Sequence, residues 1–269
     1  MISSTSNQQI KTIVQLNKKA RARRELRAFV VEGVKMFAET PRSLLQRVYV
    51  SEHFLEKEEN RVLLERSGAD YETVSDGVFA HASDTGTPQG ILAIVGMPSY
   101  GFAGLLRGQE TRLLVLEDIQ DPGNLGTMFR TAEGAGMSGV IMSRNTVDLF
   151  APKTVRATMG SIYRVPFYVS GDLQETLREL SRAGVHSYAA HLQGKCWYDE
   201  PDYTRPSAFL IGNEGNGLKE ETAACADLYV KIPMEGRLES LNAAMSAGIF
   251  MYEAYRQCRR ERSAYAHLV

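Results

Sequence analysis

Residues 232–257 read IPMEGRLESLNAAMSAGIFMYEAYRQ, and the character of this stretch changes halfway along it. Residues 232–234 close an apolar strand, residues 235–237 form a turn, and a helix capped by Ser240 follows. Apolar residues at helical spacing share one face of that helix, next to Gly248: Leu241, Met245, Ile249 and Tyr252. A polar Ser-Leu-Asn sequence thus lies at a strand-to-helix junction, where backbone N–H groups lack partners and α/β sheets hold ligands. The alternative is an ordinary capped amphipathic helix packed on a sheet.

The chain as a whole has the size and composition of a globular protein with two domains. It has 269 residues, of which 43% are hydrophobic and 23% are charged, and one hydrophobic core rarely serves a chain of that length. No apolar run is long enough to span a bilayer, and the N-terminus lacks an apolar segment after a basic start. We therefore expect a cytoplasmic protein without a membrane partner.

Cysteine and histidine usage argues against disulfides and metal sites. The three cysteines are odd in number and widely spaced: Cys196, Cys225 and Cys258. The five histidines form no HExxH motif and no cluster with carboxylates: His53, His81, His186, His191 and His267. We therefore expect no metal.

A basic cluster interrupts the nearly neutral charge of the chain. The formal net charge is −1, yet residues 11–27 carry seven basic residues against the single acid Glu25: Lys11, Lys18, Lys19, Arg21, Arg23, Arg24 and Arg27. Such a cluster is typical of a polyanion-binding surface. A solvated helix face is the alternative.

Strands and helices alternate along the whole chain. Residues 1–98 predict a small α/β domain, and the glycine-rich residues 99–110 predict a linker. In residues 111–269 the alternation is stronger, with strands near residues 112, 139, 165, 186, 208 and 228 and helices between most of them. This order predicts a mostly parallel sheet with helices on both faces.

Two further segments combine glycine with polar side chains at predicted strand ends. Residues 118–130 read DIQDPGNLGTMFR, a strand end, a Pro-Gly turn and a helix start. Asn124 and Arg130 are six residues apart and do not share a helix face, so they share a site only if Asn124 acts from the turn. Residues 210–218 read LIGNEGNGL, where glycines let the backbone approach a ligand and Glu214 is the only ionisable side chain. A surface role for Arg130 and a tight turn at the glycines are the alternatives.

One glycine pattern is excluded as a nucleotide site. Residues 134–139, GAGMSG, match the G-x-G-x-x-G pattern. They follow a predicted helix and precede a predicted strand, which is the reverse of the order that a dinucleotide-binding turn requires. The sequence also contains no Walker A loop and no G-x-S-x-G nucleophile turn.

Together, the three segments resemble the motifs of the SpoU (TrmH-type) branch of the SPOUT RNA 2′-O-ribose methyltransferases. The matching stretches are NLGTMFR at 124–130, GNEGNGL at 212–218 and IPM-x-G-x-x-x-SLN at 232–242. Residues 29–33, after the basic cluster, and residues 87–91 look, more loosely, like the substrate-binding domain that often precedes this catalytic domain.

The resemblance implies a fold that the pattern alone does not give. It implies an α/β protein in which a knotted (trefoil), SPOUT-type parallel-sheet catalytic domain follows a small α/β RNA-binding domain. Pattern reasoning alone predicts an open, unknotted sheet. The resemblance also implies bound S-adenosylmethionine (AdoMet) and a homodimer formed through the knotted domain.

The family's site residues transfer by position in the motifs. Those that match catalytic and substrate-orienting positions are Asn124, Arg130, Glu214, Ser240 and Asn242. Those that match the AdoMet cleft are Leu210, Gly212, Gly217, Ile232, Met234 and Leu241. Because a guanidinium stays protonated, we expect Arg130 to clamp a phosphate and stabilise alkoxide charge, with Glu214 and Asn242 orienting it.

The function that follows is methyl transfer from AdoMet to a ribose 2′-OH in RNA. Ribosomal RNA is favoured over transfer RNA because an additional RNA-binding domain suits a folded substrate. The alternatives are a tRNA 2′-O-methyltransferase and a non-catalytic RNA-binding or ribosome-assembly protein with the same fold.

Overall fold

The computed structural model describes residues 1–266 and, from residue 261 on, the backbone only. It contains two compact units. Unit 1 comprises Met1–Pro98 and Asp148–Tyr163, and unit 2 comprises Ser99–Val147 and the chain from Arg164 onward. The second segment of unit 1 therefore comes from the half of the chain in which the sequence pattern predicts the catalytic domain.

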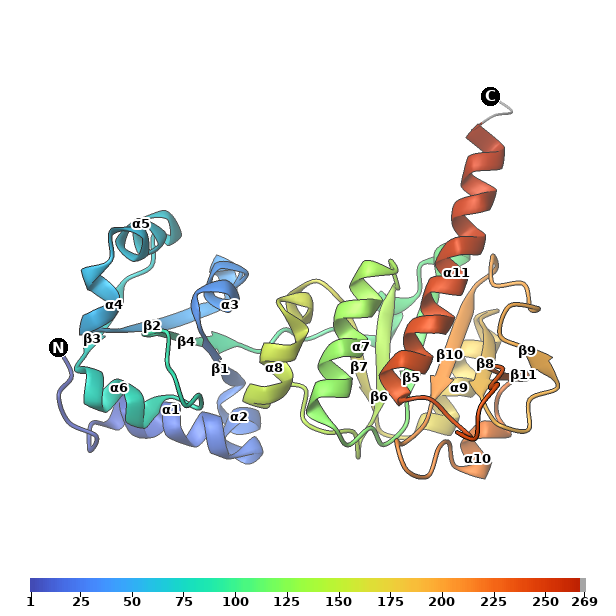
Figure 1. Ribbon diagram of the computed structural model, residues 1–269, viewed down its shortest axis with the longest axis horizontal. Helices are drawn as coiled ribbons and strands as arrows, with labels where there is room; N and C mark the ends of the chain where they lie inside the picture. The colour runs from blue at the N-terminus through green and yellow to red at the C-terminus, as the bar shows by residue number, and fades with distance from the viewer. Residues whose placement is uncertain (267–269) are drawn as a thin grey trace. The chain divides into compact units, whose positions relative to one another are not determined.

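Unit 1 is built on a four-stranded sheet with the order β1-β4-β2-β3, in which only β2 and β3 pair in parallel. The strands are β1 (Ala28–Glu32), β2 (Leu45–Ser51), β3 (Tyr71–Val74) and β4 (Ile91–Gly96). The helices are α1 (Gln8–Lys18), α2 (Ala20–Leu26), α3 (Val34–Ala38), α4 (Glu52–Glu56), α5 (Glu58–Ser67) and α6 (Asp76–Ala82). Figure 1 shows α1 and α6 on one face of the sheet and α3 to α5 on the other.

The core of unit 1 lies between its sheet and the pair α1 and α6. Ile10, Ile13 and Leu16 of α1 are buried against β1, β4 and α6. The backbone of Lys19 is extended and separates α1 from α2, so the basic cluster spans two helices. Asn7 caps the first helix by accepting a hydrogen bond from the Gln9 backbone N–H at 2.8 Å.

Arg23, one of the seven basic residues of the N-terminal cluster, is a structural residue. Its side chain is buried, contacts Asp148 at 2.7 Å and donates to the backbone carbonyls of Leu16 and Asn17. A buried ion pair of this kind leaves an uncompensated charge when one partner is removed, at a cost of about 3–5 kcal/mol. Arg23 is thus unavailable to a polyanion, whereas the other six basic residues are exposed.

The segment Asp148–Tyr163 packs on β1 of unit 1. Phe29 of β1 contacts Phe150 and Tyr163, with ring centroids 5.0 and 6.3 Å apart. The Tyr163 hydroxyl lies 3.0 Å from the Thr40 hydroxyl, and burial raises the pKa of Tyr163 to about 12. The helix α8 (Pro152–Thr158) of this segment therefore belongs to the packing of unit 1.

Unit 2 contains a seven-stranded parallel sheet with the order β7-β6-β5-β10-β8-β11-β9. The strands are β5 (Arg112–Leu116), β6 (Gly139–Ser143), β7 (Phe167–Ser170), β8 (His186–Ala190), β9 (Cys196–Trp197), β10 (Ser207–Ile211) and β11 (Leu228–Lys231). This confirms the predicted α/β class and the parallel sheet. The two-residue β9 was not predicted, because so short a strand has no periodicity to detect.

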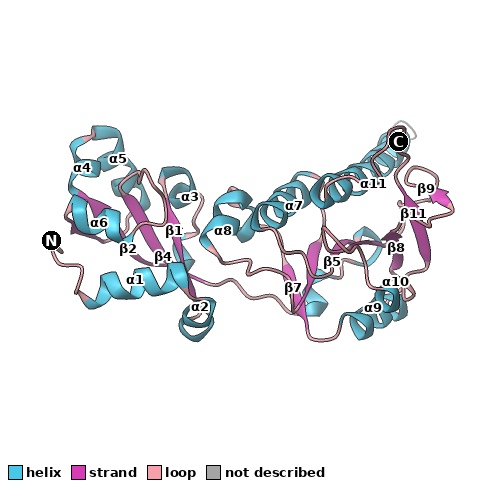
Figure 2. Ribbon diagram, turned by 60° about the horizontal axis from the view of Figure 1, so that its bottom comes forward, coloured by secondary structure: helices cyan, strands magenta, loops and turns pink. Residues whose placement is uncertain are grey.

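Helices cover both faces of this sheet, with α7 (Pro122–Gly134) and α11 (Ala243–Ala266) on one side and α9 (Leu173–Arg182) and α10 (Glu220–Ala223) on the other (Figure 2). A hydrophobic core under α9 joins Leu177 and Leu180 to Val115, Ile141 and Leu210 of the sheet. No helix in residues 1–266 combines the length and the apolar character that crossing a bilayer requires.

The helix α11 buries a different face from the one expected. Its buried apolar residues include four alanines, Ala243, Ala244, Ala247 and Ala254, together with Phe250, Met251 and Cys258. Alanine lets α11 approach α7 and β10 closely, which the larger side chains on the opposite face would prevent. Of the predicted apolar face, Met245 and Tyr252 are 61% and 49% exposed and Ile249 is half-buried, and the neighbouring Tyr255 is 41% exposed. This face is therefore only partly covered in the single chain.

Candidate active site

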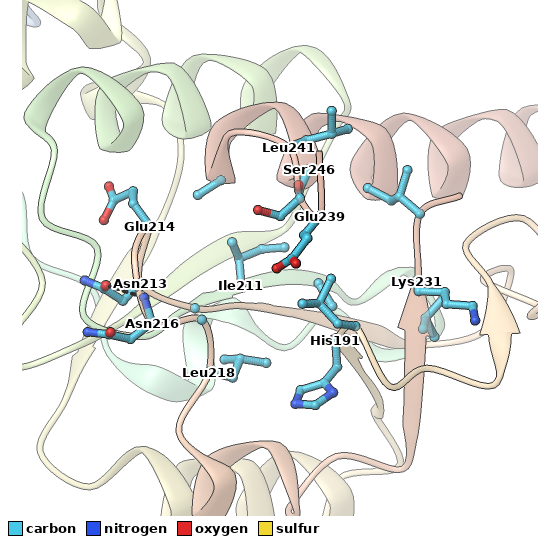
Figure 3. Close-up of a pocket in the computed structure, with 18 of the residues that line it drawn as sticks. His191, Ile211, Asn213, Glu214, Asn216, Leu218, Lys231, Glu239, Leu241 and Ser246 are labelled. Carbon is cyan, nitrogen blue, oxygen red and sulfur yellow. Dashed lines mark hydrogen bonds between the residues drawn. The ribbon is translucent and has the colours of Figure 1, made fainter. Parts of the chain in front are cut away.

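A cavity of about 420 Å³ lies at the carboxyl ends of the neighbouring strands β8, β10 and β11 (Figure 3). Parallel sheets place ligands at this edge. The lining comes from four segments that lie far apart in the sequence: residues 190–193, 211–218, 230–234 and 239–250. The lining combines apolar side chains, among them Ile211, Leu218 and Phe250, with polar ones.

The loop after β10 turns back on itself so closely that only glycine fits at position 212. A Cβ atom on Gly212 would lie 2.0 Å from the Gly217 carbonyl carbon and 2.1 Å from the Leu218 nitrogen. Asn213 and Gly217 close the loop with two backbone hydrogen bonds, of 3.0 and 2.9 Å. The backbone of this loop therefore forms part of the cavity wall, as the glycine spacing predicted.

The loop is anchored to the end of β5 through Asn213. Its Nδ2 donates to the Asp118 carbonyl at 2.9 Å, and its Oδ1 accepts from the backbone N–H groups of Gly215 and Asn216. Asp118 in turn contacts Lys219 at 2.8 Å. Burial alone would raise the pKa of Asp118, but hydrogen bonds from Lys219 and Ser143 outweigh it and lower the pKa.

Glu214 connects this loop to the start of α7. Its carboxylate accepts hydrogen bonds of 3.0 Å from three donors: the backbone N–H groups of Gln120 and Asp121 and the Nδ2 of Asn124. Burial acts to raise the pKa of Glu214, but these hydrogen bonds together lower it below its usual value. Glu214 is therefore an anion held in one orientation.

Asn124 and Asn242 extend the chain of hydrogen bonds to the third motif. The Asn124 Oδ1 accepts from the Asn242 Nδ2 at 3.0 Å, and the Asn242 Oδ1 accepts from the backbone N–H groups of Ala244 and Met245. Asn242, and not Ser240 as expected, therefore caps α11, which begins two residues later than predicted. One polar network thus joins all three sequence motifs.

Asn124 lies within the first turn of α7 and not in a turn before it, since Asp121 is the residue that caps this helix. Arg130 is six residues farther along the same helix, about 9 Å along the helix axis, and its side chain leaves the helix on a different face from that of Asn124. Arg130 is exposed and makes no hydrogen bond or ion pair with any residue that the structure describes. The expectation that Glu214 and Asn242 orient Arg130 is therefore wrong for the single chain, because Glu214 is already bonded elsewhere.

Five of the six residues expected in the cofactor cleft line the cavity: Gly212, Gly217, Ile232, Met234 and Leu241. Leu210 does not, because it is fully buried in β10 and its side chain lies in the core of the sheet. Ser240 also lines the cavity.

Sequence reasoning missed the contribution of residues 190–193 and of several single side chains, including Glu239 and Ser246. His191 directly follows β8, which neighbours β10 in the sheet. The signal that identifies it is the carboxyl end of an adjacent strand, and this signal is usable only once the strand order is known.

The described residues contain no evident metal-binding site. Within residues 1–266 there is no group of three or more His, Cys, Asp or Glu residues placed to hold a metal ion. His267 lies outside the described residues.

The hydrogen bonds to Glu214 predict a specific dependence of stability on pH. A lowered folded-state pKa contributes stability above the unfolded value of 4.5, and this stability is lost as the pH falls through the folded value. Glu214→Gln removes this titration, so the variant should lose less stability than the unmutated protein between about pH 5 and 3. Urea unfolding across that range measures the difference. Glu220→Gln, at an exposed position of α10, is the control and should leave the pH dependence unchanged.

Two family models match the chain. Residues 111–252 match the SpoU rRNA methylase family, and residues 7–93 match the MRM3-like substrate binding domain. Among curated proteins, the 23S rRNA (guanosine(2553)-2′-O)-methyltransferase RlmP of Bacillus subtilis is 33% identical over 252 residues, which cover 93% of this chain and 97% of that protein.

Solved structures show the same similarity over nearly the full length. An AdoMet-bound rRNA methyltransferase from Sinorhizobium meliloti superposes with a TM-score of 0.83 at 31% identity, covering 95% of this chain and 97% of the other. The SpoU methyltransferase AviRb from Streptomyces viridochromogenes, in complex with AdoMet, has a TM-score of 0.82 at 25% identity and covers 93% and 98%.

Proposed function

The chain belongs to the SpoU rRNA methylase family, and we propose that it transfers a methyl group from AdoMet to a ribose 2′-OH of ribosomal RNA. The observation that carries the proposal is the network Glu214–Asn124–Asn242, which joins three distant motifs through Glu214, a residue that lines the cavity. RlmP of Bacillus subtilis, which matches 93% of the chain, carries rRNA 2′-O-methyltransferase activity in its name.

The residues around the cavity fit AdoMet. The volume of about 420 Å³ lies in the range of small-molecule sites. Apolar side chains face the cavity beside the bare backbone of the loop after Gly212, which suits an adenosine ring and its polar edge. When bound, AdoMet supplies the electrophilic methyl group of the reaction. Gly212, Gly217, Ile232, Met234 and Leu241 are the residues that we propose to hold it.

The polar network orients the acceptor hydroxyl. Each asparagine amide nitrogen has two N–H groups, and the network uses one from Asn124 and one from Asn242. The second N–H of each amide can therefore hold the ribose oxygen, while Glu214 prevents the Asn124 amide from turning over. Ser240, which lines the cavity two residues before Asn242, offers a hydroxyl to the same substrate. Such fixed positioning is a major source of rate enhancement.

Arg130 acts on the RNA phosphate adjacent to the reacting ribose and stabilises the alkoxide charge that develops as the hydroxyl loses its proton. In a single chain, Arg130 does not join the network. We propose that it does so in a homodimer, where Arg130 of one subunit reaches the site of the other.

The partly covered face of α11 supports this dimer. Met245, Tyr252 and Tyr255 of α11 are 61%, 49% and 41% exposed, and Leu241, which precedes the helix, is 36% exposed. Gly134 of α7 lies beside the Tyr252 hydroxyl, so the helix that carries Arg130 borders the same face. Exposed apolar surface of this extent is typical of a protein contact.

The dimer is tested by sedimentation. We expect the unmutated protein to sediment with twice the mass of the chain, and Tyr252→Glu to shift it to the monomer because a carboxylate is costly to bury there. Leu26→Glu, at a residue of unit 1 that is 52% exposed, is the control and should leave the dimer intact. A monomeric unmutated protein would refute the proposed dimer.

Unit 1 is proposed to bind the RNA. Residues 7–93 match a substrate binding domain. Six basic residues of the N-terminal cluster remain exposed after Arg23 is set aside: Lys11, Lys18, Lys19, Arg21, Arg24 and Arg27. Their charge suits a phosphate backbone. Among the described residues, Arg21 is the only one of these six that has an ion-pair partner, Glu25 at 2.6 Å.

The trefoil knot remains a proposal that the order of the strands supports. β10 lies between β5 and β8, both of which precede it in the chain, and β11 then lies beyond β8. α11 returns to pack on β10 and α7. The cytoplasmic location expected from the sequence also remains a prediction.

The function is tested by methyl transfer from labelled AdoMet into RNA from cells that lack the protein, with rRNA and tRNA separated. Label in rRNA supports the proposal. Label confined to tRNA identifies a tRNA methyltransferase. AdoMet binding without transfer to either RNA would indicate the non-catalytic alternative.

A further inference from the structure

Three residues with a full formal charge line the cavity: Glu214, Lys231 and Glu239. Two of them are engaged elsewhere. Glu214 accepts three hydrogen bonds from the start of α7. The Lys231 Nζ lies 4.5 Å from the centre of the Trp197 ring, at the edge strand of the sheet. In Figure 3 its amine points away from the cavity.

The one histidine in the lining is engaged as well. The ring of His191 packs against Tyr229, with centroids 4.8 Å apart. Its Nδ1 accepts a hydrogen bond from the Gln193 backbone N–H at 3.2 Å.

Glu239 differs from these residues. Its side chain comes from the segment before α11, lines the cavity and is exposed, and in Figure 3 its carboxylate is drawn beside Ile211. It makes no hydrogen bond or ion pair with another residue in the described part of the chain. Glu239 is exposed, and a carboxylate that lacks a partner at the wall of a cavity favours a cationic ligand group.

From this placement, and on the basis of the proposed function, we propose that Glu239 recognises the sulfonium charge of AdoMet and thereby distinguishes the methyl donor from its demethylated product. AdoMet has one more positive charge than S-adenosylhomocysteine, in which the sulfur is a neutral thioether. A carboxylate near the sulfur therefore strengthens binding of the donor and not of the product.

The position of Glu239 in the chain indicates that it recognises the sulfonium of AdoMet and not the amino group. Glu239 directly precedes Ser240, and consecutive Cα atoms are about 3.8 Å apart. Ser240 lines the cavity, and Asn242, two residues farther on, belongs to the network proposed to hold the acceptor hydroxyl. The reactive sulfur must point toward that hydroxyl. The amino group is present in both compounds, so its recognition would give no selectivity.

The test compares the affinities of AdoMet and S-adenosylhomocysteine by titration calorimetry. In Glu239→Gln we expect AdoMet to bind about tenfold more weakly, whereas the affinity for S-adenosylhomocysteine changes less than about twofold. Glu235→Gln is the matched control, because Glu235 is an exposed acid on the same loop that does not line the cavity. It should change neither affinity.

The calorimetric results for Glu239→Gln either support the recognition of the sulfonium or overturn it. Equal weakening of both compounds would mean that Glu239 shapes the cavity or contacts the amino group, and would overturn the proposal. Unchanged affinity for AdoMet would overturn it as well. If the unmutated protein bound neither compound, the proposed function itself would fail.

Discussion

Replacing Arg130 by lysine should lower the rate of methyl transfer about 100-fold or more and leave AdoMet affinity unchanged. Lysine keeps the positive charge but loses the planar pair of donors that holds a phosphate and a developing alkoxide together. AdoMet binding should be unaffected because Arg130 does not line the cavity. Single-turnover transfer to rRNA and calorimetry with AdoMet measure the two effects separately. Activity near that of the unmutated protein would remove Arg130 from the chemistry.

A mixing experiment shows which subunit supplies Arg130. Arg130→Ala and Asn242→Ala should each be inactive alone. If Arg130 acts across the dimer, mixed dimers contain one intact site, and equal mixing should restore about a quarter of the unmutated activity. If Arg130 acts within its own chain, no mixed dimer contains an intact site and no activity returns.

Gly212→Ala should abolish AdoMet binding and destabilise the protein by about 3 kcal/mol or more. The added Cβ would overlap the backbone of Gly217 and Leu218 at 2.0 and 2.1 Å, and backbone atoms cannot move aside as a flexible side chain does. Calorimetry with AdoMet and thermal unfolding measure the two effects.

Gly215→Ala is the matched control within the same loop. A Cβ there meets only the Asn213 Oδ1 at 3.5 Å, which is an ordinary contact. Because Gly215 also lines the cavity, this variant is a control for stability alone, and we expect its stability to stay close to that of the unmutated protein. A Gly212→Ala variant that binds AdoMet normally would show that the close approach of the two loop ends is not needed for the site.

Local sequence patterns predicted the elements of this protein better than their arrangement. β5 and β8 begin at residues 112 and 186, near which the sequence predicts strands, and α7 begins within residues 118–130, where the sequence predicts a helix start. Such elements have strong periodicity and clear starts, as at Asp172, which caps α9. The order of the strands is a property of the whole chain, and no local pattern encodes the insertion of β10 between β5 and β8.

The face that α11 buries illustrates a second limit. Spacing identified Met245 and Tyr252 as one apolar face, but spacing does not say whether such a face covers the chain's own core or a partner. The core side consists largely of alanine, which a count of large apolar residues overlooks. Arg23 shows that a cluster of charged residues in the sequence does not reveal which of them are buried. Its burial depends on Asp148, which is 125 residues away.

The candidate site was predictable to the extent that its motifs are local. Glycine spacing alone points to the loop at Gly212, and the strand-to-helix junction points to Asn242 at the start of α11. The hydrogen bond from Asn242 to Asn124, 118 residues earlier, depends on the packing of α11 beside α7. Glu239 and His191 belong to no periodic pattern, and only the cavity identifies them.

The central claim is that the network Glu214–Asn124–Asn242 presents a ribose hydroxyl to the methyl donor. The most direct measurement is digestion of enzymatically methylated rRNA with alkali, which cleaves RNA only next to a free 2′-OH. We predict that the incorporated label is recovered in alkali-resistant dinucleotides from a single position, and that Asn124→Ala abolishes it. Label recovered in mononucleotides with a methylated base would contradict the claim.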